Sequence, residues 1–325
     1  MRQLSQDFPH EKTEEEEEIV LINGCAVLNP WRFNGVLGAA AAALCFWVLP
    51  VCGQESGQNA ADAVAKGKIL FEAGGCANCH TDRKAKGPLG AGGAALKTPF
   101  GNFFAPNITP DKAHGIGTWT DAQFVRAMRD GVAPDGSHYF PVFPYTSFTN
   151  MTDADIKALK AFIFTLQPVA RPNKPHDVGF PFNVRFGQFF WKLMYFERGP
   201  YKPDPAKSAE WNRGAYLARA VAHCGECHTP RNALGGLDGS RWFTGAKKGE
   251  GPEGEGVPNI RSEQGEGIHK WSSEQIETYL GSGEDPDGDY AGSLMFDVID
   301  KGTEMLSESD LKAITAYLKD LPPLR

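Results

Sequence analysis

The chain lacks the sequence features by which the common enzyme classes are recognised. Its 325 residues contain no phosphate-binding loop, no Ser–His arrangement for nucleophilic catalysis and no constellation of carboxylates. Basic residues are outnumbered, 33 Lys and Arg against 40 Asp and Glu, and the formal net charge of −7 gives no indication of a nucleic-acid partner. Methionine and cysteine are scarce, at six and seven residues. The informative features are therefore the positions of a few sulfur-containing residues.

Four of the seven cysteines form two copies of one short motif, CANCH and CGECH. Two thiols three residues apart on a helical turn can both bond to the vinyl groups of one porphyrin, and the histidine that follows can then bind the iron. Zinc ribbons and redox dithiols share the Cys-x-x-Cys spacing, but the immediate histidine in both copies favours c-type haem. The sequence thus predicts two covalent haem c groups. Their attachment residues are Cys76, Cys79 and His80 in the first copy and Cys224, Cys227 and His228 in the second.

The motifs belong to a longer internal repeat. The first cysteines of the two motifs are 148 residues apart (224 − 76), APNIT at Ala105–Thr109 matches VPNIR at Val257–Arg261 at an offset of 152, and the segments that begin at Met151 and Leu306 match at 155. Offsets that grow in small steps indicate one duplicated domain with loop insertions. We expect a mainly α fold of two tandem domains, at residues 61–168 and 209–323, joined by a linker at 169–208.

Local signals place the helices of each domain. In each domain, a helical stretch precedes the haem motif and a capping box marks the first residues of a middle helix. The last helix is amphipathic and ends before a proline. The expected positions are Ala61–Gly75 and Ala209–His223 before the motifs, the boxes Thr120 to Gln123 and Ser272 to Gln275, and last helices from Asp153 and Glu308 that end before Pro168 and Pro322.

The segment before the first domain predicts export. Residues 35–53 contain no charge, which suits either a cleaved signal peptide or a retained membrane anchor. A lipid anchor on Cys52 is a third option, although Val51 is large for the position before such a cysteine. Residues 1–34 include the acidic run Glu14–Glu18. They are either a disordered tail or a stretch included because the start of the protein is misassigned. The other three cysteines, Cys25, Cys45 and Cys52, all lie here, so no disulfide framework is implied.

With these motifs in hand, the chain resembles the duplicated class I cytochromes c that are related to the cytochrome subunits of membrane-bound alcohol, gluconate and fructose dehydrogenases. The resemblance covers about Ala61 to Pro323 and rests on CANCHTD, TPFGNFFAPNITPD, PDGSHYFPVFPYTSF, WNRGAYLARAVAHCGECHTPRN and VPNI. It implies a periplasmic protein, either released or anchored to the inner membrane, that accepts electrons from a dehydrogenase and passes them to another cytochrome or a terminal oxidase. Such relatives usually carry three haem motifs, and this chain has two.

The resemblance also directs attention to the sixth iron ligand, which is normally a methionine in class I cytochromes. Met295 stands seven residues after the second PDG, in what reads as a glycine-rich loop, with Met305 as its rival. Phe143 occupies the corresponding place in the first copy and cannot bind iron. Met151 and His138 are the candidates there, and an open iron is the third option.

Other residues have looser assignments by resemblance. Pro88 is expected to supply the carbonyl that accepts the N–H of the proximal histidine. Asn107 and Asn259 either bind haem propionates or stabilise turns, and Arg83 and Arg231 either pair with propionates or are simply exposed.

Residues Phe186 to Phe196 form an aromatic stretch at helical spacing that belongs to neither repeat. It either packs between the two domains or docks a dehydrogenase or the membrane surface. Three functions remain open: an electron carrier, a dihaem enzyme such as a peroxidase or a sulfur-compound oxidoreductase that uses an open first iron, and a structural docking subunit.

Overall fold

The computed structural model describes residues 21–22, 25–26, 52–261 and 267–322. The chain divides into two compact units, Met1–Asn59 and Ala60–Arg325. In the first unit, the short strand β1 (Leu21–Ile22) pairs in antiparallel fashion with β2 (Cys25–Ala26). Most of the expected tail and leader, residues 1–20 and 27–51, falls outside the described residues. Among the helices that are described, none is long and apolar enough to cross a bilayer.

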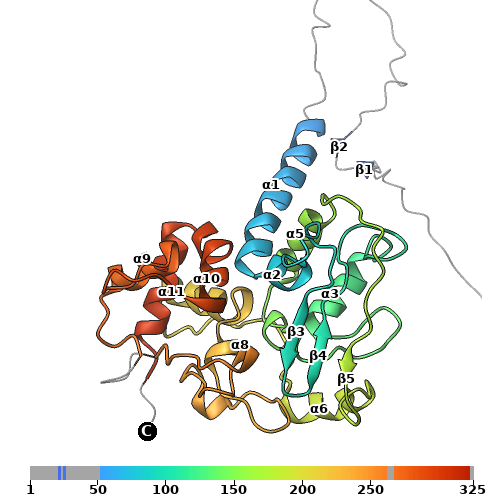
Figure 1. The fold of residues 1–325 in the computed structure, drawn as a ribbon. Helices are drawn as coiled ribbons and strands as arrows, with labels where there is room; N and C mark the ends of the chain where they lie inside the picture. Colours follow the sequence, from blue (N-terminus) through green and yellow to red (C-terminus); the bar gives the residue numbers. More distant parts are fainter. Residues whose placement is uncertain (1–20, 23–24, 27–51, 262–266, 323–325) are drawn as a thin grey trace, which may run out of the picture. The chain divides into compact units, whose positions relative to one another are not determined.

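The second unit is mainly helical, and its helices occur in the same order twice (Figure 1). The helices of the first repeat are α1 (Cys52–Ala73, begun in the first unit), α2 (Cys76–His80), α3 (Asp121–Asp130), α4 (Tyr145–Phe148) and α5 (Asp153–Ile163). Those of the second are α7 (Ala209–Tyr216), continued by the π-helix η1 (Leu217–Val221), α8 (Gly225–His228), α9 (Ser273–Ser282), α10 (Ser293–Asp300) and α11 (Glu308–Lys319). Short 3-10 turns lie at η2 (Gly239–Arg241), η3 (Pro252–Gly254) and η4 (Thr303–Met305).

Both predicted capping boxes are confirmed. The Thr120 hydroxyl accepts from the Gln123 backbone at 3.2 Å while Gln123 accepts from the Thr120 N–H at 2.9 Å. Ser272 and Gln275 repeat this exchange at 3.1 and 2.8 Å. Each box satisfies two backbone donors that a helix start would otherwise leave open, which explains why both helices begin where the sequence predicts.

The first and last helices of each repeat cross at a glycine. A Cβ atom on Gly67 of α1 would lie 1.9 Å from the Ala158 carbonyl oxygen of α5, and one on Gly214 of α7 would lie 1.8 Å from that of Ala313 in α11. Only glycine lets the two backbones approach this closely. The crossing therefore has the same construction in both repeats.

A π-helical turn separates the second crossing from its haem motif. The crossing glycines are 147 residues apart (214 − 67), whereas the motifs are 148 apart (224 − 76). One extra residue is what a single π-turn inserts into a helix, and η1 lies between the two positions. The turn thus keeps the second motif in register with the first.

One hydrophobic core serves both repeats. A continuous cluster of buried side chains runs from Phe71 and Ile156 in the first repeat to Leu217 and Ile314 in the second. A smaller cluster joins Phe140 to Phe103 and Val178, which are residues of a three-stranded antiparallel sheet. That sheet consists of β3 (Ala95–Thr98), β4 (Gly101–Phe104) and β5 (Asp177–Val178), in that order.

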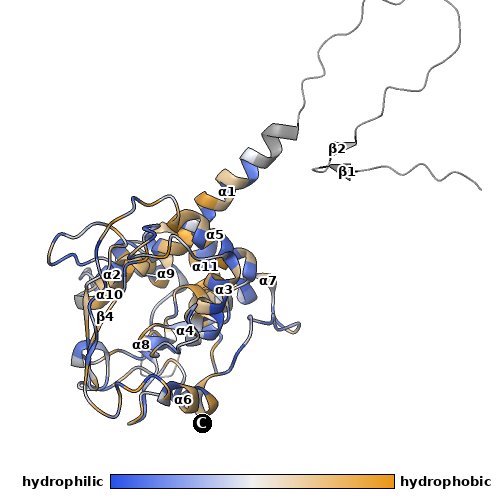
Figure 2. Ribbon diagram, turned by 90° about the vertical axis from the view of Figure 1, so that its right-hand side faces the viewer, coloured by the Kyte–Doolittle hydropathy of each residue, from blue (hydrophilic) through white to orange (hydrophobic). Residues whose placement is uncertain are grey.

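The predicted aromatic helix is α6 (Gly187–Tyr195), and it contacts both repeats. The Lys192 ammonium donates to the carbonyls of Asp130 and Gly131 at 2.6 and 2.8 Å, and the Trp191 indole donates to the Leu234 carbonyl at 2.8 Å. Figure 2 shows much of this helix in orange, the colour of hydrophobic residues. Because the opposite face of α6 is exposed, both sequence interpretations of this helix retain structural support.

Candidate functional site

Each haem motif lies on a short helix that follows a residue in the left-handed region. Gly75 precedes α2 with φ of 59°, and His223 stands before the second motif with φ of 40°. The backbone reverses there and starts a new helical turn, which brings two cysteines and one histidine together. Both predicted attachment triplets are thus on single helical turns.

The thiols of these motifs are unsuited to dithiol exchange. Burial raises the pKa of Cys79 and of Cys227 to about 11, so neither is a thiolate at neutral pH in the folded chain. Within the described residues, no group of three or more His, Cys, Asp or Glu side chains is arranged to hold a metal ion. An uncharged thioether bond to a porphyrin fits this apolar setting better than a redox dithiol.

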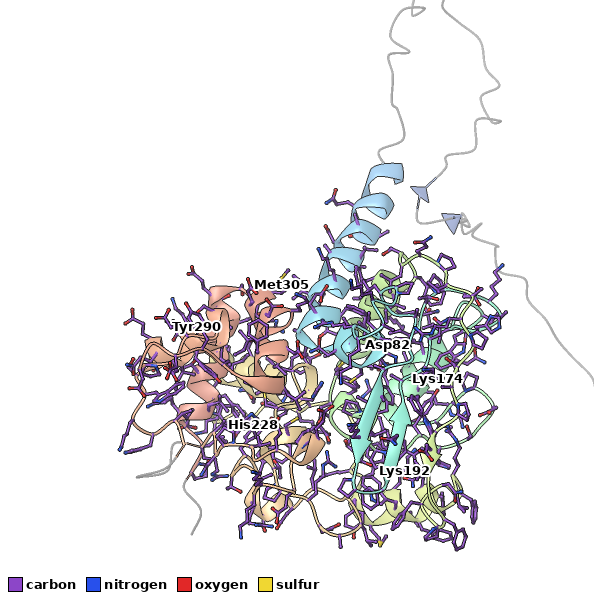
Figure 3. All side chains as sticks on the ribbon, in the orientation of Figure 1. Asp82, Lys174, Lys192, His228, Tyr290 and Met305 are labelled. Carbon is purple, nitrogen blue, oxygen red and sulfur yellow. The ribbon has the colours of Figure 1, made fainter. Side chains whose placement is uncertain are left out.

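Each proximal histidine is held at both its ring and its backbone. The Nδ1–H of His80 donates to the Pro106 carbonyl and that of His228 to the Pro258 carbonyl, both at 2.8 Å. Because Nδ1 is committed, Nε2 is the nitrogen that remains for iron. Burial lowers the pKa of both rings despite these carbonyl bonds, which favours the neutral form that binds metals. Figure 3 shows His228 among the side chains of the second repeat.

The expectation for Pro88 is wrong. Its carbonyl accepts from the Ala91 backbone N–H at 3.1 Å, and the proline that faces the His80 ring is Pro106. The sequence carried a signal for this: Pro-Asn occurs at the same place in APNIT and VPNIR, whereas the second copy has no equivalent of Pro88. A proline whose role depends on the shared fold should occur in both repeats, and Pro106 and Pro258 do.

Two glycines complete the histidine clamps. The backbone N–H groups of Gly92 and Gly245 donate at 2.8 Å to the carbonyls of His80 and His228. Both glycines have positive φ, 70° and 79°, and a Cβ atom on either would lie 2.5 Å or less from backbone atoms around the clamp proline. These positions therefore require glycine.

Asn107 was expected either to bind a haem propionate or to stabilise a turn, and its contacts are those of a turn-stabilising residue. Its side chain is 2% exposed, and its Nδ2 donates to the carbonyls of Val169 and Arg171 at 2.8 and 3.2 Å. Its Oδ1 accepts from the Thr109 backbone and hydroxyl. Asn259 accepts similarly from the Arg261 N–H at 2.8 Å. The amide of Asn107 is satisfied within the protein, which leaves it no bond to offer a propionate.

The candidates for the sixth iron ligand occupy different settings. Met295 lies on α10 rather than in a loop, and its partly buried side chain packs against the core. Met151 is 1% exposed within the same core. Met305 is 43% exposed, and Figure 3 shows it far from His228. His138 accepts at Nδ1 from Lys192 at 3.0 Å, which requires the proton on Nε2 and makes it a poor ligand.

The expected propionate partners are engaged elsewhere. Arg83 donates to Asn78 at 2.8 Å, and Arg231 donates to Glu226 at 2.5 Å. Each arginine therefore contacts the third residue of its own haem motif, a role that sequence analysis did not anticipate.

The residues present fit two covalent haems. Each motif offers two thiols and an imidazole with its Nε2 available, and beside the first repeat's Phe143 the buried Tyr145 hydroxyl has no hydrogen-bond partner among the described residues. A buried hydroxyl without a partner fits a site at which a bound group supplies the missing contact. When bound, each haem supplies an iron that alternates between ferric and ferrous.

Comparison with known proteins supports this geometry. Residues 64–167 match the family described as cytochrome c. The chain is 45% identical over 265 residues to a protein of Cereibacter sphaeroides described as a dihaem c-type cytochrome, a match that covers 80% of this chain and 86% of that protein. It is 38% identical over 262 residues to the fructose dehydrogenase cytochrome subunit of Gluconobacter japonicus. It is 35% identical over 272 residues to the gluconate 2-dehydrogenase cytochrome c subunit of Pantoea cypripedii.

The last two matches cover 80% and 81% of this chain but only 53% and 60% of those relatives, so the chain spans little more than half the length of each. These names support electron transfer and give no support to a dihaem peroxidase or a sulfur-oxidising enzyme. The match to the Cereibacter sphaeroides protein extends over both attachment motifs and 86% of that protein. The chain belongs to the cytochrome c family as a dihaem c-type cytochrome, an electron-transfer protein with two covalent haem c groups.

Proposed function

We propose that this cytochrome accepts electrons from a dehydrogenase in the periplasm and passes them to another cytochrome or a terminal oxidase. The observation that carries the proposal is the pair of complete attachment sites, each with its own clamped histidine, in one chain that resembles dehydrogenase cytochrome subunits. Two haems in series suit transfer from a donor at one end to an acceptor at the other. The uncharged segment at 35–53 provides for export, by cleavage or as an anchor to the inner membrane.

The architecture behind this proposal is two tandem class I cytochrome c domains, residues 61–168 and 209–323, with 169–208 as the linker. The repeated helix order, the two glycine crossings and the two histidine clamps support it. For the distal ligands, we propose Met295 at haem 2 and Met151 at haem 1. Both are sulfur side chains packed in or against the core that surrounds the motifs.

An apolar surface on and before α6 is the site at which we place the dehydrogenase. We define it by Phe180, Phe186, Phe190, Leu193 and Met194, whose side chains are 84%, 71%, 52%, 71% and 59% exposed. A patch of this kind on a protein surface marks an interaction site. Its helix contacts both repeats, so a partner bound there lies beside both haem domains.

The experiment mixes the matured cytochrome with each periplasmic dehydrogenase purified from the same cells and measures haem reduction after substrate addition. Phe186→Ser combined with Leu193→Ser should slow reduction, because it removes two exposed apolar contacts without disturbing the core. Tyr290→Ser is the matched control, since Tyr290 is 67% exposed and lies on the opposite side of the unit from Lys192 of α6 (Figure 3). Equal rates in all three proteins would place the donor elsewhere, and no reduction of the wild type would reject a dehydrogenase donor.

A further inference from the structure

The third residue of each haem motif forms side-chain hydrogen bonds to the other repeat. In the first motif, Asn78 donates from Nδ2 to the Asp297 carbonyl at 3.1 Å, and Asp297 belongs to α10 of the second repeat. In the second motif, Glu226 accepts at Oε1 from the hydroxyls of Thr146 and Ser147 at 2.6 and 2.8 Å, and both belong to α4 of the first repeat. The contacts are therefore reciprocal.

An arginine completes each set of contacts. Arg83 donates to Asn78 Oδ1 at 2.8 Å and to Asp297 Oδ1 at 3.2 Å. We call Asn78, Arg83 and Asp297 the first bridge. Arg231, at the equivalent position in the second repeat, donates to Glu226 Oε2 at 2.5 Å. We call Glu226, Arg231, Thr146 and Ser147 the second bridge.

Each bridge pairs an arginine with one carboxylate, but the carboxylate belongs to the haem motif in one bridge and to the partner helix in the other. In the second bridge the carboxylate belongs to the haem motif and the partner helix offers hydroxyls. In the first bridge the motif offers a neutral amide and the partner helix carries the carboxylate of Asp297. The second bridge is the more buried one, because the Glu226 side chain is 7% exposed and that of Asp297 is 47% exposed. Burial favours the uncharged acid, but the Arg231 charge and the two hydroxyls outweigh it and lower the pKa of Glu226.

The chain that leads into the motifs also crosses between repeats. The Nε2–H of His223, directly before the second motif, donates to the Gly74 carbonyl at 3.1 Å, two residues before the first motif. In addition, α10 carries Met295 two positions before Asp297. One short helix thus touches the attachment motif of haem 1 and bears the proposed ligand of haem 2.

We propose that the two bridges hold the two haem-attachment motifs in one fixed relation and so determine how fast electrons pass between the haems of a single chain. Asn78 and Glu226 act as positioning residues in this exchange. The haem that gives the electron is oxidised from ferrous to ferric, and the other is reduced from ferric to ferrous. The inference rests on the two covalent haems and not on the identity of the donor, so it can fail while the dehydrogenase proposal stands, and the reverse.

The test alters the amide of the first bridge, using matured protein with both haems verified by mass spectrometry. Asn78→Asp replaces the Nδ2 donor with a carboxylate oxygen that faces the Asp297 carbonyl acceptor, so the first bridge should open. Asn78→Gln keeps both the donor and the acceptor and is the matched control. The split Soret signal in circular dichroism, which reports the mutual orientation of two haems, should disappear in Asn78→Asp and persist in Asn78→Gln. Rates of electron equilibration after partial photoreduction should follow the same pattern.

A second pair of variants leaves both motifs untouched. Thr146→Val with Ser147→Ala removes the two hydroxyl donors from Glu226 and should weaken the split Soret signal and slow equilibration between the haems. Arg241→Gln is the control, because it removes an ion pair with Asp238 at 2.8 Å that is local to one loop of the second repeat. A purely structural role would change the unfolding temperature and leave both signals as in the wild type. Wild-type signals in the hydroxyl variant or in Asn78→Asp would overturn the proposal.

Discussion

The two glycine crossings allow a direct test of whether the repeats share one construction. Gly67→Ala and Gly214→Ala each place a Cβ atom 1.9 or 1.8 Å from a carbonyl oxygen, whereas real Cβ contacts are essentially never under 3.0 Å. The helices must therefore separate by 1.1 Å or more (3.0 − 1.9). Overpacking of this kind costs about 3 kcal/mol at the upper end of its range. Alanine has a better helix propensity than glycine, which offsets about 1 kcal/mol of this loss in the free energy of unfolding.

The expected net loss is thus about 2 kcal/mol at each site, or a fall of about 4–8 °C in the unfolding temperature. The assay is thermal unfolding of the matured protein followed by far-ultraviolet circular dichroism, with haem content checked before heating. Gly57→Ala is the matched control in the same helix as Gly67, because a Cβ atom at Gly57 meets nothing within 4 Å. If Gly67→Ala and Gly57→Ala behave alike, the crossing is not close-packed. If only one of the two crossing variants is destabilised, the repeats are not built alike.

Three further predictions concern the haem sites. Met295→Ala should abolish the sulfur-to-iron charge-transfer band of haem 2 and lower its potential, because a thioether favours ferrous iron; visible spectra and a redox titration check this, and an unchanged band would exclude Met295 as ligand. Replacing Cys76 and Cys79 by Ala should reduce the haem count from two to one by mass spectrometry and also lower the unfolding temperature of the remaining haem domain, since one core serves both repeats; full stability of that domain would contradict the shared core. Glu226→Gln should cost about 1.5–3 kcal/mol at pH 7, because it weakens the charge-assisted hydrogen bonds that Glu226 accepts from Arg231, Thr146 and Ser147. Because the pKa of Glu226 is lowered on folding, its contribution is complete above the unfolded value of about 4.3 and is lost as the pH falls through the folded value. The difference between wild type and variant, measured by thermal unfolding from pH 7 to 3, should therefore close in acid, and a constant difference would refute the linkage.

Features formed by residues close together in the chain were predicted from the sequence. Helix starts at Thr120 and Ser272 were predicted correctly because a capping box is made by residues three apart, whose geometry the helix itself sets. The attachment triplets were equally local, since two cysteines and a histidine within five residues share one helical turn. The helical nature of the aromatic stretch followed from its spacing alone.

Contacts between distant segments were decided only by the tertiary structure. The carbonyl that faces His80 comes from Pro106, 26 residues away, and not from Pro88, which is nearer in sequence. The partner of Asn78 is 219 residues away in α10, and the partners of Glu226 are 79 and 80 residues away in α4. The spacing of residues along the chain does not predict which repeat a side chain will contact.

The sequence by itself therefore determined the chemistry of this cytochrome: two haems, two histidines and the helices that present them, all from patterns within a few residues. The tertiary structure decided how those pieces are coupled. The crossing of helices at Gly67 and Gly214, the single core and the two bridges depend on backbone approach and burial between segments that lie far apart in the chain. Such approach is selected by packing the whole unit, which is why duplicated sequences could be recognised as equal while their mutual contacts could not be foreseen.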